Sequence, residues 1–536
     1  MQRHSKLILG IDFGTSKSGL AIFEGRGKAR ILARSGGDGT AAAFPDWAFP
    51  TEVVLTTGTT NEIVAPIYLS FSSNYKDNYE DVLGCPGLKQ KMRSGSLKLR
   101  LGETMLLNNT EYKINDLIPE FLQYMWKELL PGTDPQNAYV VLGMPAGCEY
   151  AKRKALVNAA HAAGFAQAEL LPEPVAGLLA LSKSKDLRDK HILVIDYGGG
   201  TCNYAIIVVD KAGHFTIQCA RSEPQGGENI TEALVKDFGP QGVSDEVTKA
   251  KVRRFLDAAK INYVPGEKIP NVEPLTTPDN VTLEFDIDKM KDQKNGFEAK
   301  IREAVSAVRD ELRRRSNGDD LHAIDEVYFL GESRHLFCFS KLFWDGWLRD
   351  VTKPESPFGL IKQESQDIET RTPNGDPFAQ SRKMVALGCA LHAGSLFASQ
   401  KTYLHSQTSW CIIGELLDMD GNPLKYRPIS NMEIRQKTPL PHKVRLNFTL
   451  GESVSGFRVK FAHGPQPSDH METFEFRPNA HSALKTLPKG TEINFKFKIR
   501  RDELIEIELC RATHLMGRPY ILAQNLEWHS DLESNS

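Results

Sequence analysis

Several features that would assign a chain to a special class are missing from this sequence. The eight cysteines are scattered, with no Cys-x-x-Cys pair and no histidine at zinc spacing, so neither a disulfide scaffold nor a zinc module is indicated. The sequence contains no run of about 18 apolar residues, the length that is needed to cross a bilayer. The N-terminus lacks the apolar stretch and the small-residue cleavage site of a signal peptide. We therefore expect a reduced, cytoplasmic protein.

A large net charge is also missing. The 536 residues include 66 Lys and Arg against 68 Asp and Glu. Because no whole-molecule field results, we expect neither a nucleic acid nor a membrane as partner. The length is sufficient for two or more domains with sizeable cores.

Two segments share one pattern. Residues 7–23 and 192–209 each contain an apolar run that ends in an aspartate, a turn rich in Gly and Thr, and a second apolar run. We interpret each segment as two β-strands joined by a tight hairpin. The spacing differs from a Walker loop and from a dinucleotide fingerprint, because Asn203 falls where a third glycine would be needed and strands follow both turns.

The two turns have the chemistry of phosphate sites. Glycine lets the backbone approach a ligand closely, and successive N–H groups form a concavity that attracts phosphate oxygens. Asp12 and Asp196 stand at the turn entrances, where a hard divalent cation needs oxygen ligands. Two facing clamps predict an ATP site. For either segment alone, a core hairpin with a glycine turn is the structural alternative.

The pair of turns resembles the phosphate-1 and phosphate-2 motifs of the superfamily of actin, sugar kinases and heat shock protein 70 (Hsp70). Further segments match the Hsp70 branch in order and spacing over roughly the first 400 residues: 140–146, 149–164, 170–180, 222–229, 327–334 and 385–393. The resemblance implies an α/β fold, a two-lobed nucleotide-binding domain of the actin-like ATPase type (duplicated ribonuclease H-like) over residues 1–398. The alternation of strand and helix patterns agrees with α/β.

From about Trp410 onward the pattern changes to strict alternation of apolar and polar residues. Val444, Leu446, Phe448 and Leu450 alternate in this way, as do the residues of 493–499. We expect an antiparallel β-sandwich over residues 405–515, followed by a tail over 516–536. It resembles a shortened Hsp70 substrate-binding domain that lacks the helical lid and the leucine-rich acidic linker. A sandwich that binds no extended peptide is the alternative.

The resemblance assigns ligand roles residue by residue. Asp12 and Asp196 would hold Mg²⁺ through its waters, and Glu173 would orient the water that attacks the γ-phosphate, so these three residues form the catalytic set. The alternative for Glu173 is a helix-start carboxylate between Pro172 and Pro174. The phosphates of ATP or ADP are expected at Gly14, Thr15, Ser16, Gly198, Gly199, Gly200 and Thr201.

The adenosine half of the ligand is assigned in the same way. Gly226 and Gly227 would line the floor of the pocket, and Gly331, Ser333 and Arg334 match an adenosine motif in which a guanidinium plane stacks on the base. Asp257 and Lys260 match a helix that brackets the ribose and adenine. Because they are three residues apart on one helix face, a surface ion pair is the alternative.

Three departures from the Hsp70 pattern affect catalysis. The catalytic aspartate expected in the second hairpin is Asn203, which cannot accept a proton. The expected lysine has no clear equivalent between Val54 and Leu83, and Lys89 and Lys91 are candidates only in a rearranged loop. Leu330 and Glu332 replace small residues of the adenosine motif, which would weaken adenine binding. We expect nucleotide binding to outlast fast hydrolysis.

Three functions remain open. We favour a divergent Hsp70-like ATP-binding protein, a slow ATPase with a chaperone-like or regulatory role, whose β-sandwich binds a protein partner or an unfolded peptide. A J-domain co-chaperone is a further partner that the resemblance implies. The alternatives are a small-molecule kinase of the same superfamily and a non-catalytic pseudo-ATPase that acts as an interaction protein.

Overall fold

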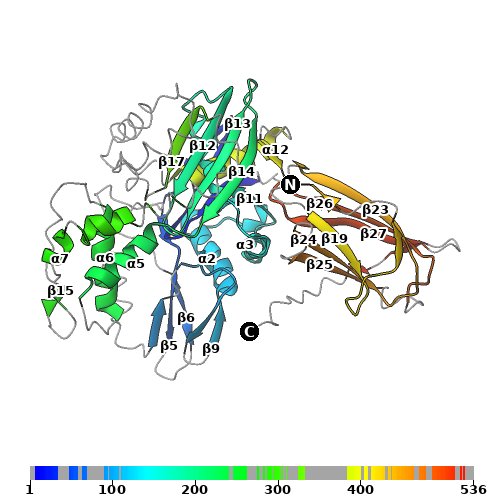
Figure 1. Cartoon of the computed structure of the whole chain (residues 1–536), viewed down its shortest axis with the longest axis horizontal. Helices are drawn as coiled ribbons and strands as arrows, with labels where there is room; N and C mark the ends of the chain where they lie inside the picture. The colour runs from blue at the N-terminus through cyan, green and yellow to red at the C-terminus, as the bar shows by residue number, and fades with distance from the viewer. Residues whose placement is uncertain are drawn as a thin grey trace. The chain divides into compact units, whose positions relative to one another are not determined.

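The chain forms two compact units in the computed structural model, Met1–Leu404 and His405–Ser536 (Figure 1). In the described part of the chain, no helix has the length and apolar content that a membrane span requires. The structure describes residues 6–33, 48–57, 63–68, 90–93, 96–107, 110–240, 246–261, 275–276, 282–283, 287–292, 294–303, 306, 310, 324–331, 333, 383–399, 404–407, 412–428, 433–435, 438–463, 470–477, 486–513, 519–521 and 523–524.

The first sheet of unit 1 is built around an N-terminal hairpin. Its strands follow the order β11-β10-β1-β2-β3, with β10 parallel to β1 and to β11, and with β1, β2 and β3 antiparallel. The short strand β4 pairs with β2. The strands are β1 (Leu7–Phe13), β2 (Lys17–Gly25), β3 (Lys28–Ile31), β4 (Ala48–Pro50), β10 (Ala138–Met144) and β11 (Gln167–Pro172).

The second sheet repeats this arrangement. A parallel neighbour, β17, pairs with β12, and β12, β13 and β14 follow one another as antiparallel strands. The pairing β17-β12-β13-β14 therefore corresponds to β10-β1-β2-β3, which is the duplication expected for the actin-like ATPase class. The strands are β12 (Lys190–Tyr197), β13 (Cys202–Val209), β14 (Phe215–Glu223) and β17 (Glu326–Leu330).

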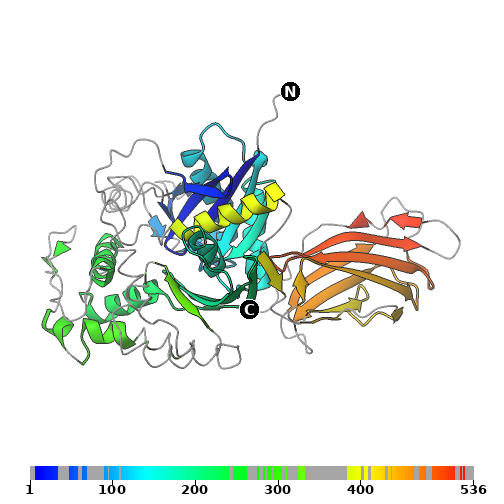
Figure 2. The ribbon, with the colours of Figure 1, turned by 90° about the horizontal axis from the view of Figure 1, so that it is seen from above.

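Two helices fill the space between these sheets. Helix α4 (Glu173–Leu181) follows β11 directly, and helix α12 (Met384–Ser399), yellow in Figure 2, crosses β1 and β2. The backbones approach so closely that a methyl group on Gly388 would overlap Ala176, and one on Gly10 would overlap Ala390. Apolar residues of both helices share one buried cluster with both sheets, including Val175, Cys389 and Val194. Small residues at these crossings therefore set the spacing of the two sheets.

The other helices of unit 1 cover the outer faces. Helix α2 (Ile114–Leu129) packs with α3 (Tyr150–Ala162), and the Trp126 and Phe165 rings lie 5.4 Å apart at this contact. Helices α5 (Gly227–Phe238) and α6 (Glu246–Ile261) share a second core with β12 and β13, near α7 (Ile287–Lys291) in Figure 1. Short elements complete the unit: η1 (Pro135–Asn137), β5 (Val53–Thr57), β6 (Ile63–Tyr68), β7 (Gln90–Arg93), β8 (Thr104–Leu107), β9 (Thr110–Lys113), β15 (Leu275–Thr276) and β16 (Thr282–Leu283).

Unit 2 contains two five-stranded antiparallel sheets. Their orders are β21-β19-β24-β25-β29 and β20-β23-β26-β27-β28, and β18 pairs with β22. The strands are β18 (Leu404–Gln407), β19 (Ile412–Leu417), β20 (Tyr426–Pro428), β21 (Glu433–Ile434), β22 (Pro439–Leu440), β23 (His442–Leu450), β24 (Phe457–His463), β25 (His470–Arg477), β26 (Glu492–Ile499), β27 (Ile505–Thr513), β28 (Pro519–Ile521) and β29 (Ala523–Gln524).

Aromatic side chains form the core of the β-sandwich. Every second residue of β26 is buried, so Phe495 and Phe497 point inward while Lys496 and Lys498 lie between them on the other face. Phe461 from the opposite sheet packs on Phe497 with ring centroids 4.9 Å apart. Each fully buried Phe contributes roughly 1.5–3 kcal/mol. The predicted fold class, a two-lobed α/β domain followed by a β-sandwich, is confirmed.

Candidate functional site

The two glycine turns stand at equivalent positions of the two sheets. Asp12 lies near the end of β1, opposite Gly19 of β2, and Asp196 lies near the end of β12, opposite Asn203 of β13. The second turn is closed by a hydrogen bond of 2.9 Å from Gly198 N to Thr201 O. Each sheet thus presents a carboxylate and a glycine turn at one edge.

These turns meet each other. Side chains on Gly199 and Gly200 would overlap Ser16 and Thr15 of the first turn. Ser16 Oγ donates to Glu228 Oε1 at 2.9 Å, which joins the first turn to the N-terminus of helix α5. Glycines are required here because two backbones approach one another.

The N-terminus of α5 packs against the second turn. Gly227 N donates to Gly198 O at 3.0 Å, and Glu228 N donates to Gly199 O at 2.6 Å. A side chain on Gly226 would overlap Gly199 O. The positive end of this helix dipole therefore lies beside the turn, where it favours an anion such as phosphate.

A buried ion pair lies between the two aspartates. Lys98 Nζ donates to Glu173 Oε1, and both side chains are buried. Burial alone would lower the pKa of Lys98, but the carboxylates of Glu173, Asp12 and Asp196 outweigh it and raise that pKa above its usual value. One ammonium group thus faces all three predicted catalytic carboxylates, and the structure brings Asp12, Asp196 and Glu173 together.

Sequence reasoning missed Lys98. It lies in a turn that is tied to the first hairpin, since Ser96 Oγ donates to Thr15 O at 2.7 Å. Lys91 lies in β7, and Lys89 is outside the described residues. Lys98 stands between Leu97 and Leu99, and such alternation ordinarily indicates a solvated lysine. A lysine fixed by contacts this distant in sequence leaves no local signal.

Asp196 is the most perturbed of the carboxylates. Burial and the nearby Glu173 carboxylate raise the pKa of Asp196 to about 7, against the opposing effect of Lys98. A divalent cation would compensate this buried carboxylate. Among the described residues, no group of three or more His, Cys, Asp or Glu side chains could hold a metal ion by itself. Asp12 and Asp196 form a donor set that fits Mg²⁺, which is usually bound by one or two carboxylates together with substrate phosphates and waters.

Asn203 lies in the middle of this cluster and is fully buried. Its Nδ2 donates to Glu173 Oε2 and to Thr201 Oγ1, both at 3.0 Å. Its Oδ1 is buried and finds no hydrogen-bond partner among the described residues. The departure from aspartate thus supplies a donor to Glu173 where the resemblance implies another carboxylate.

The predicted adenosine residues form a second cluster around Gly227. Lys260 Nζ donates to Gly227 O at 2.8 Å and to Thr231 Oγ1 at 2.7 Å, and it pairs with Asp257 Oδ1 at 2.7 Å. Burial would raise the pKa of Asp257, but Lys260 and a hydrogen bond from Thr231 hold it below its usual range. The Lys260 side chain is 5% exposed and that of Asp257 37%, so the pair lies at the edge of the interior and is anchored to Gly227 and Thr231.

The remaining adenosine residues lie where β17 ends. Gly331 has a φ of +85°, and a methyl group there would lie 2.7 Å from Asp196 Oδ1. Ser333 is buried, and its Oγ would overlap a side chain on Gly227. Leu330 points into the core against Gly177. Arg334 and Glu332 lie outside the described residues.

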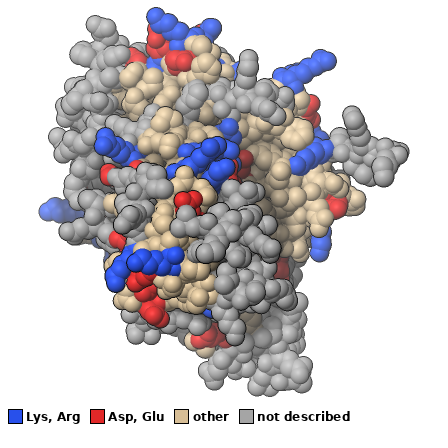
Figure 3. Space-filling view, turned by 90° about the vertical axis from the view of Figure 1, so that its right-hand side faces the viewer, with Lys and Arg blue, Asp and Glu red and all other residues tan. Residues whose placement is uncertain are grey.

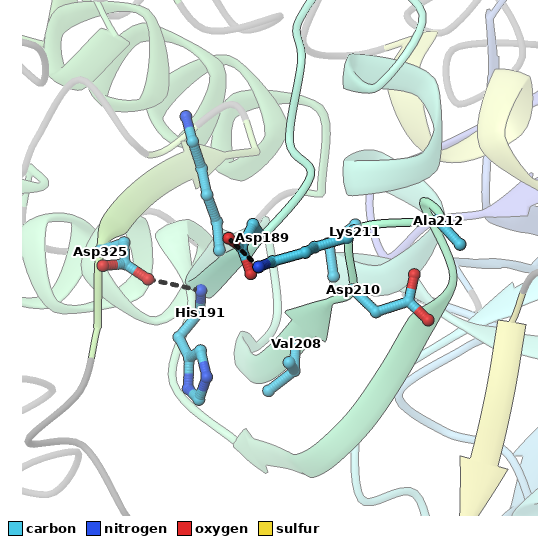
Figure 4. A pocket seen from close by; sticks show the side chains of 9 residues that line it. Asp189, His191, Val208, Asp210, Lys211, Ala212 and Asp325 are labelled. Carbon is cyan, nitrogen blue, oxygen red and sulfur yellow. Dashed lines mark hydrogen bonds and ion pairs between the residues drawn. The ribbon is translucent and has the colours of Figure 1, made fainter.

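A separate hollow of about 740 Å³ lies at the opposite ends of β12 and β13 (Figure 4). It is lined by nine residues, among them Asp189, His191, Lys211 and Asp325. Lys211 pairs with Asp189 at 3.8 Å, and His191 N donates to Asp325 Oδ2 at 2.8 Å. Because these charged groups are satisfied by one another, we assign the hollow no function.

One face of the molecule shows Lys and Arg interspersed with Asp and Glu (Figure 3).

The duplicated sheets and facing turns define the class of protein: an actin-like ATPase fold followed by a β-sandwich. The family model described as Hsp70 protein matches residues 8–261. Chaperone protein DnaK of Metamycoplasma hominis is 25% identical over 356 residues, which cover 63% of this chain and 54% of that protein. Chaperone protein DnaK of Elusimicrobium minutum is 27% identical over 266 residues, which cover 47% of this chain and 39% of that protein.

The matched region includes both glycine turns, Lys98, Glu173 and Lys260. The chain spans about half the length, or less, of the relatives it matches. Over the matched region the chain is similar to Hsp70 proteins.

Proposed function

We propose that the chain is an ATP-binding protein of the Hsp70 type that hydrolyses ATP slowly and binds a protein partner through its β-sandwich. The observation that carries this proposal is the buried Lys98 ammonium, which faces Glu173, Asp12 and Asp196 between two equivalent glycine turns. Perturbed, mutually compensating charges inside a duplicated phosphate cradle are typical of a functional site.

Different residues of the site would bind the metal ion, the adenosine and the phosphates of the ligand. Mg²⁺ would be held by Asp12 and Asp196 through its waters, and the adenosine would lie near Asp257, Lys260, Gly331, Ser333 and Arg334, above Gly226 and Gly227. The phosphates of ATP or ADP would lie against Gly14, Thr15, Ser16, Gly198, Gly199, Gly200 and Thr201. Asn203 Nδ2 donates to the Thr201 hydroxyl oxygen, so the hydroxyl hydrogen is available to a phosphate.

The chemistry depends on placement and charge. A bound Mg²⁺ neutralises charge that develops on the phosphates. Lys98 supplies a positive charge that needs no rearrangement because Glu173 already holds it in place. Glu173 orients the attacking water. The neutral Asn203 provides less charge than a carboxylate would, so we expect slow turnover.

The β-sandwich would bind the protein partner. The relatives are named chaperones, and by analogy an unfolded peptide or a protein partner is the expected ligand, with a J-domain protein as a further candidate. The expected cytoplasmic location stays a prediction. A small-molecule kinase finds no supporting observation in the described residues, whereas the substitution at position 203 favours a non-catalytic protein as the second candidate.

A thermal-shift experiment tests binding. The full chain is heated with Mg-ATP, with Mg-ADP and without nucleotide, because a ligand at a hundred times its dissociation constant adds about 2.7 kcal/mol to the native state. We expect a shift with both nucleotides that Asp12→Ala abolishes, while Asp420→Ala, at an exposed turn of unit 2, retains it. Absence of a shift in the unmodified protein would contradict the proposal.

Phosphate release then separates the candidates. Steady release without an acceptor, lost in Glu173→Gln, supports a slow ATPase. Binding without any release supports the non-catalytic protein. Release that needs a small-molecule acceptor supports a kinase.

A further inference from the structure

The orientation of the Asn203 amide is fixed by its surroundings. A carboxylate can only accept hydrogen bonds, so the side that faces Glu173 Oε2 must be the NH₂ group. The second amide hydrogen is donated to Thr201 Oγ1. Oδ1 therefore points away from both, although it is buried.

Glu173 is correspondingly held at both oxygens. Oε1 accepts from Lys98 and Oε2 accepts from Asn203. A carboxylate in this position is well ordered, because a cation and an amide donor each hold one of its oxygens. Its direction is thus set by two groups from different segments of the chain.

A buried polar atom without a partner is rare and costly in a native protein, so Asn203 Oδ1 needs a donor. Thr201, which accepts from the same amide, is one of the residues assigned to the triphosphate. A water molecule next to the γ-phosphate would supply that donor, and a neutral amide can orient an attacking water without accepting its proton.

We propose that Asn203 is a positioning residue with two functions: its NH₂ group holds Glu173 in place, and its carbonyl oxygen orients the attacking water. This inference rests on the proposed nucleotide-binding function. The bond from water oxygen to γ-phosphorus forms while the bond to the bridging oxygen breaks, and ADP leaves with that electron pair. The water proton goes to a γ-phosphate oxygen, which gives dihydrogen phosphate.

Two substitutions of similar size separate the two functions. Asn203→Asp retains the oxygen and loses the donor, whereas Asn203→Leu loses both. The same changes at Asn447, an exposed residue of β23, are the matched controls. All variants are compared by melting temperature without nucleotide, by Mg-ATP thermal shift, and by single-turnover ATP hydrolysis.

Both Asn203 variants should melt at lower temperature, and Asn203→Asp at the lowest, because it places a carboxylate against Glu173. Hydrolysis should follow a different order. Asn203→Asp keeps the oxygen but no longer donates to Glu173, so it should hydrolyse ATP at an intermediate rate, while Asn203→Leu should be at least about tenfold slower than the unmodified protein with its nucleotide affinity within about threefold. A purely structural role predicts instead that the least stable variant is the slowest.

The inference is overturned if Asn203→Leu hydrolyses ATP at the unmodified rate, if rates follow melting temperatures, or if the unmodified protein binds ATP but does not hydrolyse it. A lack of any Mg-ATP shift in the unmodified protein would instead overturn the proposed function itself.

Discussion

Lys98 and Glu173 form a buried ion pair across 75 residues of sequence, with each side chain less than a tenth exposed. The pair lies where the two glycine turns meet, and Asp12 and Asp196 act on the same ammonium group. Such a pair is weak evidence for stability, because desolvation offsets its attraction. Its place among three carboxylates supports the proposed nucleotide site.

Removing only the lysine of this ion pair should lower the stability of the protein. Lys98→Met leaves Glu173 buried without its cation and should lower the free energy of unfolding of unit 1 by about 3–5 kcal/mol. Hydrogen exchange in β1 and β12 during urea unfolding measures this within unit 1. The double variant Lys98→Met/Glu173→Gln should recover part of the loss, since no uncompensated charge remains at that pair.

An exposed ion pair supplies the control for this prediction. Lys443 pairs with Glu508 at 2.8 Å on the surface of the sandwich. Lys443→Met should change stability by less than about 1 kcal/mol. Equal losses for Lys98→Met and Lys443→Met would contradict the importance of burial.

Glycine at 331 should be irreplaceable. Its φ of +85° and its close approach to Tyr197 O leave no space for a methyl group. Gly331→Ala should therefore cost more than the roughly 1–2 kcal/mol expected from backbone strain alone, and it should weaken nucleotide binding because Asp196 is displaced. Gly421→Ala is the control, because Gly421 has a φ of +87° with nothing within 4 Å. If both variants cost the same by thermal unfolding, packing at Gly331 has no role.

The core of the sandwich offers a test of unit 2 alone. Phe497 is fully buried and contacts Phe461 and Phe495. Phe497→Ala should lower the stability of unit 2 by about 3–5 kcal/mol through lost burial and a cavity. Hydrogen exchange in β26 reports the loss, and Lys496→Ala on the opposite face should change it by less than about 1 kcal/mol. A loss confined to unit 1 peptides would contradict the observed packing.

Much of this architecture could be predicted because its signals are local. Each hairpin is encoded by one short segment that contains apolar runs, an aspartate and glycines. The buried face of β26 can be predicted from the alternation of apolar and polar residues alone. The contacts that complete the site are not local. The residues flanking Lys98 indicate an exposed strand-like pattern, and only the folded chain brings it to Glu173.

The contacts of Asn203 are also ones that the sequence alone does not reveal. The sequence predicts that this residue cannot act as a proton acceptor. It gave no indication that the amide would donate to Glu173, because that requires the end of β11 and the start of β13 to meet in space. The roles assigned to the individual site residues stay predictions until a nucleotide is bound.

Lys154 predicts how the stability of unit 1 depends on pH. This half-buried residue of α3 has a pKa lowered by burial to about 7. Between pH 7 and about 10 the unfolded chain binds more protons at this residue than the folded chain does, so the free energy of unfolding should rise with pH over that range. Urea unfolding at pH 7, 8 and 9 measures the slope.

Two substitutions identify Lys154 as the source of that slope. Lys154→Met removes the buried charge, so it should stabilise the protein at pH 7 and flatten the rise. Lys154→Arg should flatten it as well but without the gain, because an arginine stays protonated throughout this range and is buried as a cation. A slope that is unchanged in both variants would show that another group is responsible, since neither replacement can release a proton between pH 7 and 10.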